Sequence, residues 1–182
     1  MALKECIRGH CMPRLIVIAA FIIGAALWGD WKSWEKYYPT ILYFIVCSLL
    51  YASMHCLYPL WRFVALAPIH NILCNDTLIC VALTFTVFPS TAILYLSHYP
   101  QGKKQVPYVF AWVLLYTSIE TCMLYFGGIT HHNGWSLTWS AFFNVILFSF
   151  LRLHYVNPKI TWGASVLFIL FIWGVFGFPV KA

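Results

Sequence analysis

The sequence predicts an all-α polytopic membrane protein, a bundle of about six hydrophobic helices that form one domain over residues 1–182. The 182 residues are 62% hydrophobic and 9% charged, whereas a soluble domain of this length needs far more charge to cover its surface. Several apolar runs approach the roughly 20 residues that a helix needs to cross a bilayer. These runs lack the alternation of membrane strands, and backbone groups in lipid must bond internally, so helices are expected.

Six hydrophobic segments can be drawn, at residues 11–29, 40–58, 77–98, 107–127, 137–154 and 160–178. Residues 1–14 form a basic N-terminal tail. The 11 Lys and Arg stand singly or in pairs between the apolar segments, against 5 Asp and Glu. This is the pattern of membrane-flanking residues, and no basic stripe with interleaved aromatics indicates nucleic-acid binding.

The first segment fits more than one arrangement. Its strictly apolar part, Leu15–Leu27, has 13 residues, which suits a re-entrant or interfacial segment. In that arrangement nine Lys and Arg lie on one side of the membrane and two on the other, which is a clear bias. Six full crossings would place six on one side and five on the other, so the positive-inside rule would then predict no orientation. The alternatives are a full span with Arg14 reaching to the interface and a signal peptide cleaved after Ala26.

The second segment follows an aromatic stretch in which Trp28, Trp31 and Trp34 recur every three residues. Their indoles suit the headgroup layer, and carbohydrate stacking is the alternative. Pro39 is expected at a helix start, where its missing N–H is harmless, and so is Pro107 before the fourth segment.

The connection at residues 59–76 is the longest and could contain a short interfacial helix. Asn75 or Asp76 is expected to cap the third segment. Within that segment Pro89 should free the carbonyl of Phe85 and kink the helix, with Ser90 or Thr91 as local donors.

The fourth segment contains Glu120 in an otherwise lipid-compatible run, and Gly127 and Gly128 follow at its end. An ionised carboxylate in the bilayer is costly, so Glu120 should face the bundle interior and be paired or protonated. Tyr116 and Thr117 share its helix face at i−4 and i−3. The sequence therefore predicts an intramembrane polar site, either a proton or cation site or an internal packing lock.

Other polar residues could complete that site. His55 ends the second segment, where a packing role is favoured over a proton relay. Asn144 lies in the fifth segment near small residues, which favours a hydrogen bond between helices. Arg152 and His154 end the fifth segment and are expected to serve its negative dipole end and the headgroups.

The loop before the fifth segment carries the adjacent pair His131 and His132. We expect both to be solvated and to act as a candidate pH sensor near pH 6–7, with Trp135 and Trp139 as interface anchors. Adjacent histidines without an acidic neighbour or a zinc motif predict no metal site. In the N-terminal tail, Cys6, His10 and Cys11 could bind metal or carry an acyl chain, although such spacing arises easily by chance.

The segments resemble a family of small, uncharacterised multi-pass membrane proteins from endospore-forming Gram-positive bacteria. The resemblance rests on GDWKSWEKYYPTILYF (29–44), LYPLWRF (57–63), NDTLICVALTFTVFPSTAILYLSHYP (75–100), Ile119-Glu120, HHNGWSLTWSAFFN (131–144) and LRLHYVNP (151–158). It covers about residues 28 to 160. It implies a polytopic helical protein of the bacterial plasma membrane, and it implies no activity and no residue roles.

Three classes of function remain open, and no catalytic motif, nucleophile constellation or cofactor is predicted. The favoured one is a structural or accessory membrane component that contacts the lipid bilayer and either a second copy or another membrane protein. The alternatives are a small proton-linked transporter or channel that uses Glu120, and a membrane sensor that uses His131 and His132. An enzyme is the least supported.

Overall fold

The computed structural model describes residues 12–55, 58–64 and 76–177. Six α-helices lie in these ranges: α2 (Met12–Trp28), α3 (Trp34–His55), α4 (Asp76–Ser97), α5 (Gln105–Tyr125), α6 (Leu137–Val156) and α7 (Pro158–Phe176). Short 3-10 turns, η2 (Trp31–Ser33) and η3 (Gly102–Lys104), precede α3 and α5. The prediction of a mainly helical chain with about six helices is therefore confirmed, including the boundaries near Gly127 and at Asn157-Pro158.

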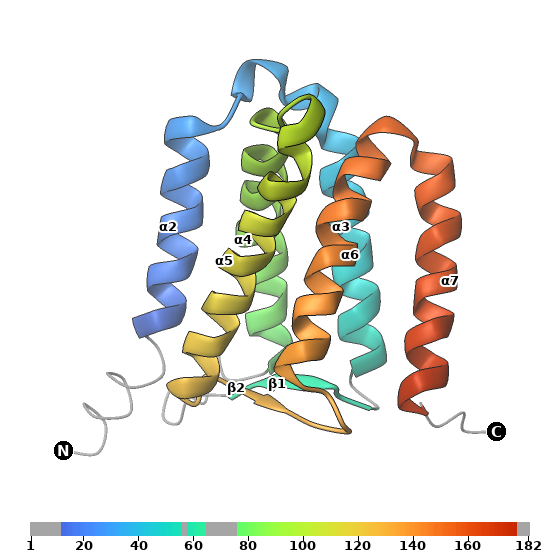
Figure 1. Cartoon of the computed structure of the whole chain (residues 1–182). Coiled ribbons are helices and arrows are strands. Elements are labelled where there is room, and N and C mark those ends of the chain that lie inside the picture. Colours follow the sequence, from blue (N-terminus) through green and yellow to red (C-terminus); the bar gives the residue numbers. More distant parts are fainter. Residues whose placement is uncertain (1–11, 56–57, 65–75, 178–182) are drawn as a thin grey trace.

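The helices stand side by side and the chain alternates in direction along them (Figure 1). The strands β1 (Trp61–Phe63) and β2 (Ile129–His131) lie across one end, which we call the ribbon end. The opposite end, which we call the basic end, holds η2, η3 and the junction between α6 and α7. The core lies between α3, α4, α5 and α6, where Tyr95 and Phe148 are fully buried. The Tyr95 hydroxyl donates to the Phe148 carbonyl at 2.9 Å and joins α4 to α6.

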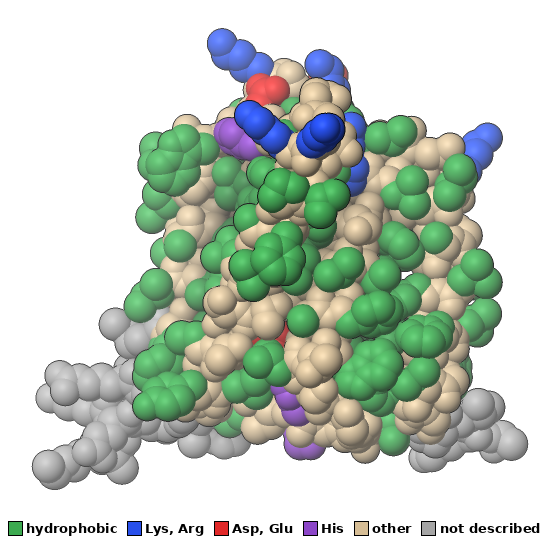
Figure 2. All heavy atoms as spheres, in the orientation of Figure 1, with side chains coloured by type: hydrophobic (Ala, Val, Ile, Leu, Met, Phe, Trp, Pro, Cys, Tyr) green, Lys and Arg blue, Asp and Glu red, His purple; other side chains and the backbone are tan. Residues whose placement is uncertain are grey.

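Four helices, α4 to α7, are long and apolar enough to cross a membrane, as judged by length and composition. Helices α2 and α3 meet that standard only as a pair, which is bent by 83° at the break between them. This bend fits a broken span or a re-entrant loop, so the described residues offer four spans, or up to five. Large apolar side chains cover the flanks of the bundle, and most of the visible Lys and Arg gather at the basic end (Figure 2).

The prediction that Pro39 starts a helix is wrong, because α3 begins at Trp34 and contains Pro39. A proline in the second turn leaves the carbonyl of Glu35 without its usual partner. Glu35 is exposed, so other polar groups can reach that carbonyl and the helix tolerates the proline. Trp31 and Trp34 are exposed, as expected of surface anchors.

Helix α4 continues through Pro89, and the predicted donors do not bond the carbonyl of Phe85. Ser90 donates to the Thr86 carbonyl at 2.8 Å, and Thr91 donates to the Val87 carbonyl at 2.7 Å. Each hydroxyl reaches the carbonyl four residues before its own position. The Phe85 carbonyl lies four residues before Pro89, which has no N–H to donate. Ser90 and Thr91 therefore donate to the next two carbonyls along the helix, and not to that of Phe85.

The connection predicted to hold an interfacial helix forms a strand in its described part. Strand β1 pairs antiparallel with β2, with Trp61 opposite His131 and Phe63 opposite Ile129. Residues 65–75, where Asn75 was expected to cap α4, lie outside the described residues.

Arg14 lies near the ribbon end of α2 and is buried, with only 7% of the residue exposed. Its guanidinium donates to the carbonyl of Val64 at 2.9 Å and to that of Gly128. It also lies 5.4 Å from the ring centroid of Phe63. Arg14 thus connects α2 to the segment that follows β1 and to the segment that precedes β2.

Candidate functional site

Glu120 lies near the ribbon end of α5 and not at the middle of the bundle. Its Oε1 atom is 2.8 Å from Nε2 of His131 in β2. The same atom accepts a hydrogen bond from the hydroxyl of Ser140 in α6 at 2.5 Å. With Glu120 ionised, both neighbours donate to one carboxylate oxygen, which joins three elements.

The network continues to the loop before α6. The indole N–H of Trp135 donates to the Ser140 hydroxyl at 2.8 Å. Trp135 and Ser140 are buried, while the side chains of His131 and Glu120 are 16% and 18% exposed. Trp135 therefore donates to Ser140, and Ser140 donates to Glu120. His131 is the second donor to the carboxylate.

Chain geometry brings these residues together. Helix α5 ends at Tyr125, and Gly127, with φ of +67°, turns the chain into β2. Strand β2 then crosses the ribbon end and places His131 against the last turns of α5. Helix α6 starts at Leu137, so that Ser140 lies in its first turn and faces Glu120.

Glu120 also lines a partly open cavity of about 240 Å³ between α2, α3, α4, α5, α6 and the ribbon. Most of its wall is apolar. Its polar side chains include those of Arg14, Ser48, Tyr51, Tyr116, Glu120, Ser140 and Asn144. A space of this size with several polar groups can hold water or a small polar ligand.

The other predicted members of the Glu120 site bond elsewhere. The Tyr116 hydroxyl pairs with that of Thr91 in α4 at 2.5 Å. Thr117 accepts from Nδ2 of Asn144 at 3.3 Å, which is the hydrogen bond between helices that the sequence predicts for Asn144. The polar face of α5 therefore contacts α4, α6 and β2 at successive positions. His55 is the last residue of α3, and its side chain lies outside the described part.

The two adjacent histidines are in different environments. His132 is exposed, and its Nε2 atom lies 2.9 Å from the Thr130 hydroxyl. The expectation that both are solvated is wrong for His131, because its side chain packs against Glu120 and is only 16% exposed. Trp135 is 7% exposed and is not the predicted interface anchor, since its indole N–H serves Ser140. No local signal in the sequence separates the two histidines, and only the tertiary structure identifies Glu120 as the acidic partner of His131.

Of the two residues predicted to serve the end of α6 and the headgroups, His154 is packed inside the bundle instead, and Arg152 is half-buried. His154 is 3% exposed, and its Nδ1 atom lies 3.0 Å from the Thr40 hydroxyl. Its ring stacks on Tyr43 with centroids 4.3 Å apart. The guanidinium of Arg152 lies 4.4 Å from the ring centroid of Tyr99. The side chains of His154 and Arg152 therefore each contact an aromatic ring, which the prediction did not consider.

No cluster of three or more His, Cys, Asp or Glu that could hold a metal ion occurs within the described ranges. The tail residues Cys6, His10 and Cys11 lie outside those ranges.

Comparison with family models, with curated proteins and with solved structures finds no match to this chain. The resemblance to the family of membrane proteins from endospore-forming bacteria therefore stays a prediction.

Proposed function

We propose that the chain is a multi-pass accessory component of the bacterial plasma membrane in which Glu120 and His131 form a proton-responsive lock. The observation that carries this proposal is the shared acceptor, Oε1 of Glu120, which joins α5 to β2 and α6 beside a cavity. Such a lock unites two of the predicted sites, the intramembrane acid and the loop histidine.

The lock depends on charge because hydrogen bonds to ionised groups are about twice as strong as neutral ones. Protonation of Glu120 removes the negative charge from the acceptor, and deprotonation of His131 removes the cation. Either change weakens the attachment of β2 to α5. The charged or titratable groups on neighbouring described elements are Arg14, which lines the same cavity, Arg62 on β1 and the exposed His132.

The charge distribution supports an orientation in which the basic end faces the cytoplasm. Six described basic residues lie at or near that end: Lys32, Lys36, Lys103, Lys104, Arg152 and Lys159. Near the ribbon end the described basic residues are Arg14, which is buried, and Arg62. Under the positive-inside rule the lock then faces the exterior.

A proton-linked transporter or channel is the second candidate, and the cavity beside Glu120 is the observation that favours it. Proton flux into liposomes separates the two functions. Flux that Glu120→Gln abolishes supports transport, whereas an accessory protein shows no flux above that of empty liposomes.

The lock is tested by a double-mutant cycle of Glu120→Gln and His131→Gln in detergent, with thermal unfolding followed from pH 5 to 9. Each single variant should lose about 1 kcal/mol of stability at neutral pH and show a flatter pH profile than the parent. The double variant should lose little more than either one.

His132→Gln is the matched control, because it changes the same residue type at the exposed neighbouring position. It should reproduce the pH profile of the parent. Additive effects of the two lock variants, or a parent-like profile in both, would refute the lock.

A further inference from the structure

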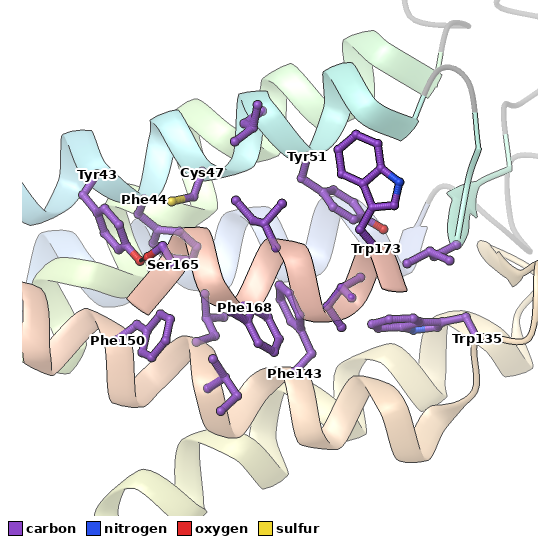
Figure 3. A pocket seen from close by; sticks show the side chains of 16 residues that line it. Tyr43, Phe44, Cys47, Tyr51, Trp135, Phe143, Phe150, Ser165, Phe168 and Trp173 are labelled. Carbon is purple, nitrogen blue, oxygen red and sulfur yellow. Dashed lines mark hydrogen bonds between the residues drawn. The ribbon is translucent and has the colours of Figure 1, made fainter. Parts of the chain in front are cut away.

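A second cavity, of about 130 Å³, lies between α3, α6 and α7 (Figure 3). Tyr43 and Ser165 lie at one end of it, and Tyr51, Trp135 and Trp173 lie at the other. Phe143 and Phe168 lie between the two ends, and Phe150 lies at the end of Tyr43 and Ser165. Because Tyr43 and Tyr51 are eight residues apart on α3, the cavity is about 12 Å long.

The chemistry of the wall excludes a polar ligand. None of the described residues that line this cavity is charged. The hydroxyls of Tyr43 and Ser165 bond to each other at 2.7 Å, and Ser165 also donates to the Thr161 carbonyl. A buried water needs two to four polar partners, which this wall does not offer at its centre.

The packing of α7 shows why the space exists. Its buried residues are Thr161 and Ser165, both in its first half. Farther along, Phe168, Ile169 and Ile172 line the cavity and do not pack closely against α3. The opposite face of α7 is exposed, with Leu167 at 69%. The cavity is also partly open to the surroundings, so hydrocarbon can enter it from a bilayer beside α7.

We propose that this cavity holds the end of one acyl tail of a bilayer lipid, inserted between α7 and α3. An engineered apolar cavity of about 150 Å³ stays dry and binds small apolar molecules, so a space of this size accepts hydrocarbon. An empty space would leave the aromatic wall without contacts. The narrow shape, with satisfied hydroxyls at one end, suits a linear chain end and excludes a headgroup.

The test uses the full chain in vesicles of phosphatidylcholine that carry a photoactivatable diazirine near the end of one acyl tail. Labelled residues are then identified by peptide mass spectrometry. The proposal expects label on Ile169 and Ile172, on the inner face of α7, as well as on the outward residue Leu167. Label confined to outward residues would overturn it.

Variants that fill the cavity provide the second measurement. Ile169→Trp on α7, and separately Cys47→Phe on α3, should reduce labelling of Ile172 to background. Leu167→Trp, on the outward face of the same helix, should leave that labelling unchanged. If a filling variant fails to fold, the labelling of Ile169 and Ile172 in the parent protein still decides the proposal. A branched isoprenoid probe that labels Ile172 while the linear probe does not would overturn the assignment of an acyl tail.

Discussion

Ser140 of α6 donates its hydroxyl hydrogen to Glu120 of α5 across 2.5 Å, and so links the two helices at the ribbon end. The same hydroxyl accepts the indole N–H of Trp135 at 2.8 Å. Ser140 is 3% exposed, so water cannot readily replace it as a partner. One small hydroxyl therefore satisfies two larger polar groups in a mainly apolar bundle.

Ser140→Ala should destabilise the protein by about 1–3 kcal/mol, because it leaves the buried indole N–H of Trp135 unsatisfied and removes a donor to Glu120. Thermal unfolding in detergent would measure this loss. Ser136→Ala is the matched control, since the Ser136 side chain makes no capping hydrogen bond to α6. An equal loss in both variants would contradict the assigned role of Ser140.

Arg14→Lys should destabilise the ribbon end by about 2 kcal/mol, because an ammonium cannot reproduce the guanidinium fork that reaches two carbonyls. The carbonyls of Val64 and Gly128 belong to segments 64 residues apart in the chain. Loss of Arg14 should therefore also increase cleavage near β1 in limited proteolysis. Arg62→Lys, at an exposed position of β1, should leave both measurements unchanged.

Most of the helical architecture could be predicted because each apolar run carries its own signal in composition and length. The ends near Gly127 and at Asn157-Pro158 were predictable for the same reason, since Gly and Pro act locally. Pro39 was misplaced because a proline is tolerated both at a helix start and within an exposed second turn. The strand pair was missed because three-residue strands such as Trp61–Phe63 have no periodicity to detect.

The candidate site was only half predictable. The cost of an ionised acid in lipid indicated that Glu120 must be paired or protonated, but the sequence has no local signal that identifies His131 or Ser140 as its partners. Those contacts depend on how α5, β2 and α6 meet. His154 was misjudged for a related reason, because its position at a helix end suggested the headgroups while its partner Thr40 lies 114 residues away.

Gly29→Ala should destabilise the junction between α2 and η2 by about 1–3 kcal/mol, as overpacking of a close contact does. A Cβ atom at Gly29 would lie 2.4 Å from the Ala25 carbonyl oxygen and 2.8 Å from the Ile93 side chain. Gly163→Ala in α7 is the matched control, because a Cβ there meets nothing within 4 Å. That control should be neutral or stabilising by up to about 1 kcal/mol. Thermal unfolding of the two variants in detergent compares them, and equal stability would contradict the close packing at Gly29.

His154→Phe should keep the aromatic stack on Tyr43 but leave the buried Thr40 hydroxyl without its partner, at a cost of about 1–3 kcal/mol. Thr40→Val in the same background removes the orphaned hydroxyl and should recover part of that loss. The double variant is therefore expected to lose less stability than the sum of the two single variants. Thermal unfolding of all four proteins in detergent gives the coupling directly. His98→Phe, at an exposed position, should change stability by less than about 0.5 kcal/mol. Additive losses would show that the contact between His154 and Thr40 contributes nothing to the packing of α6 against α3.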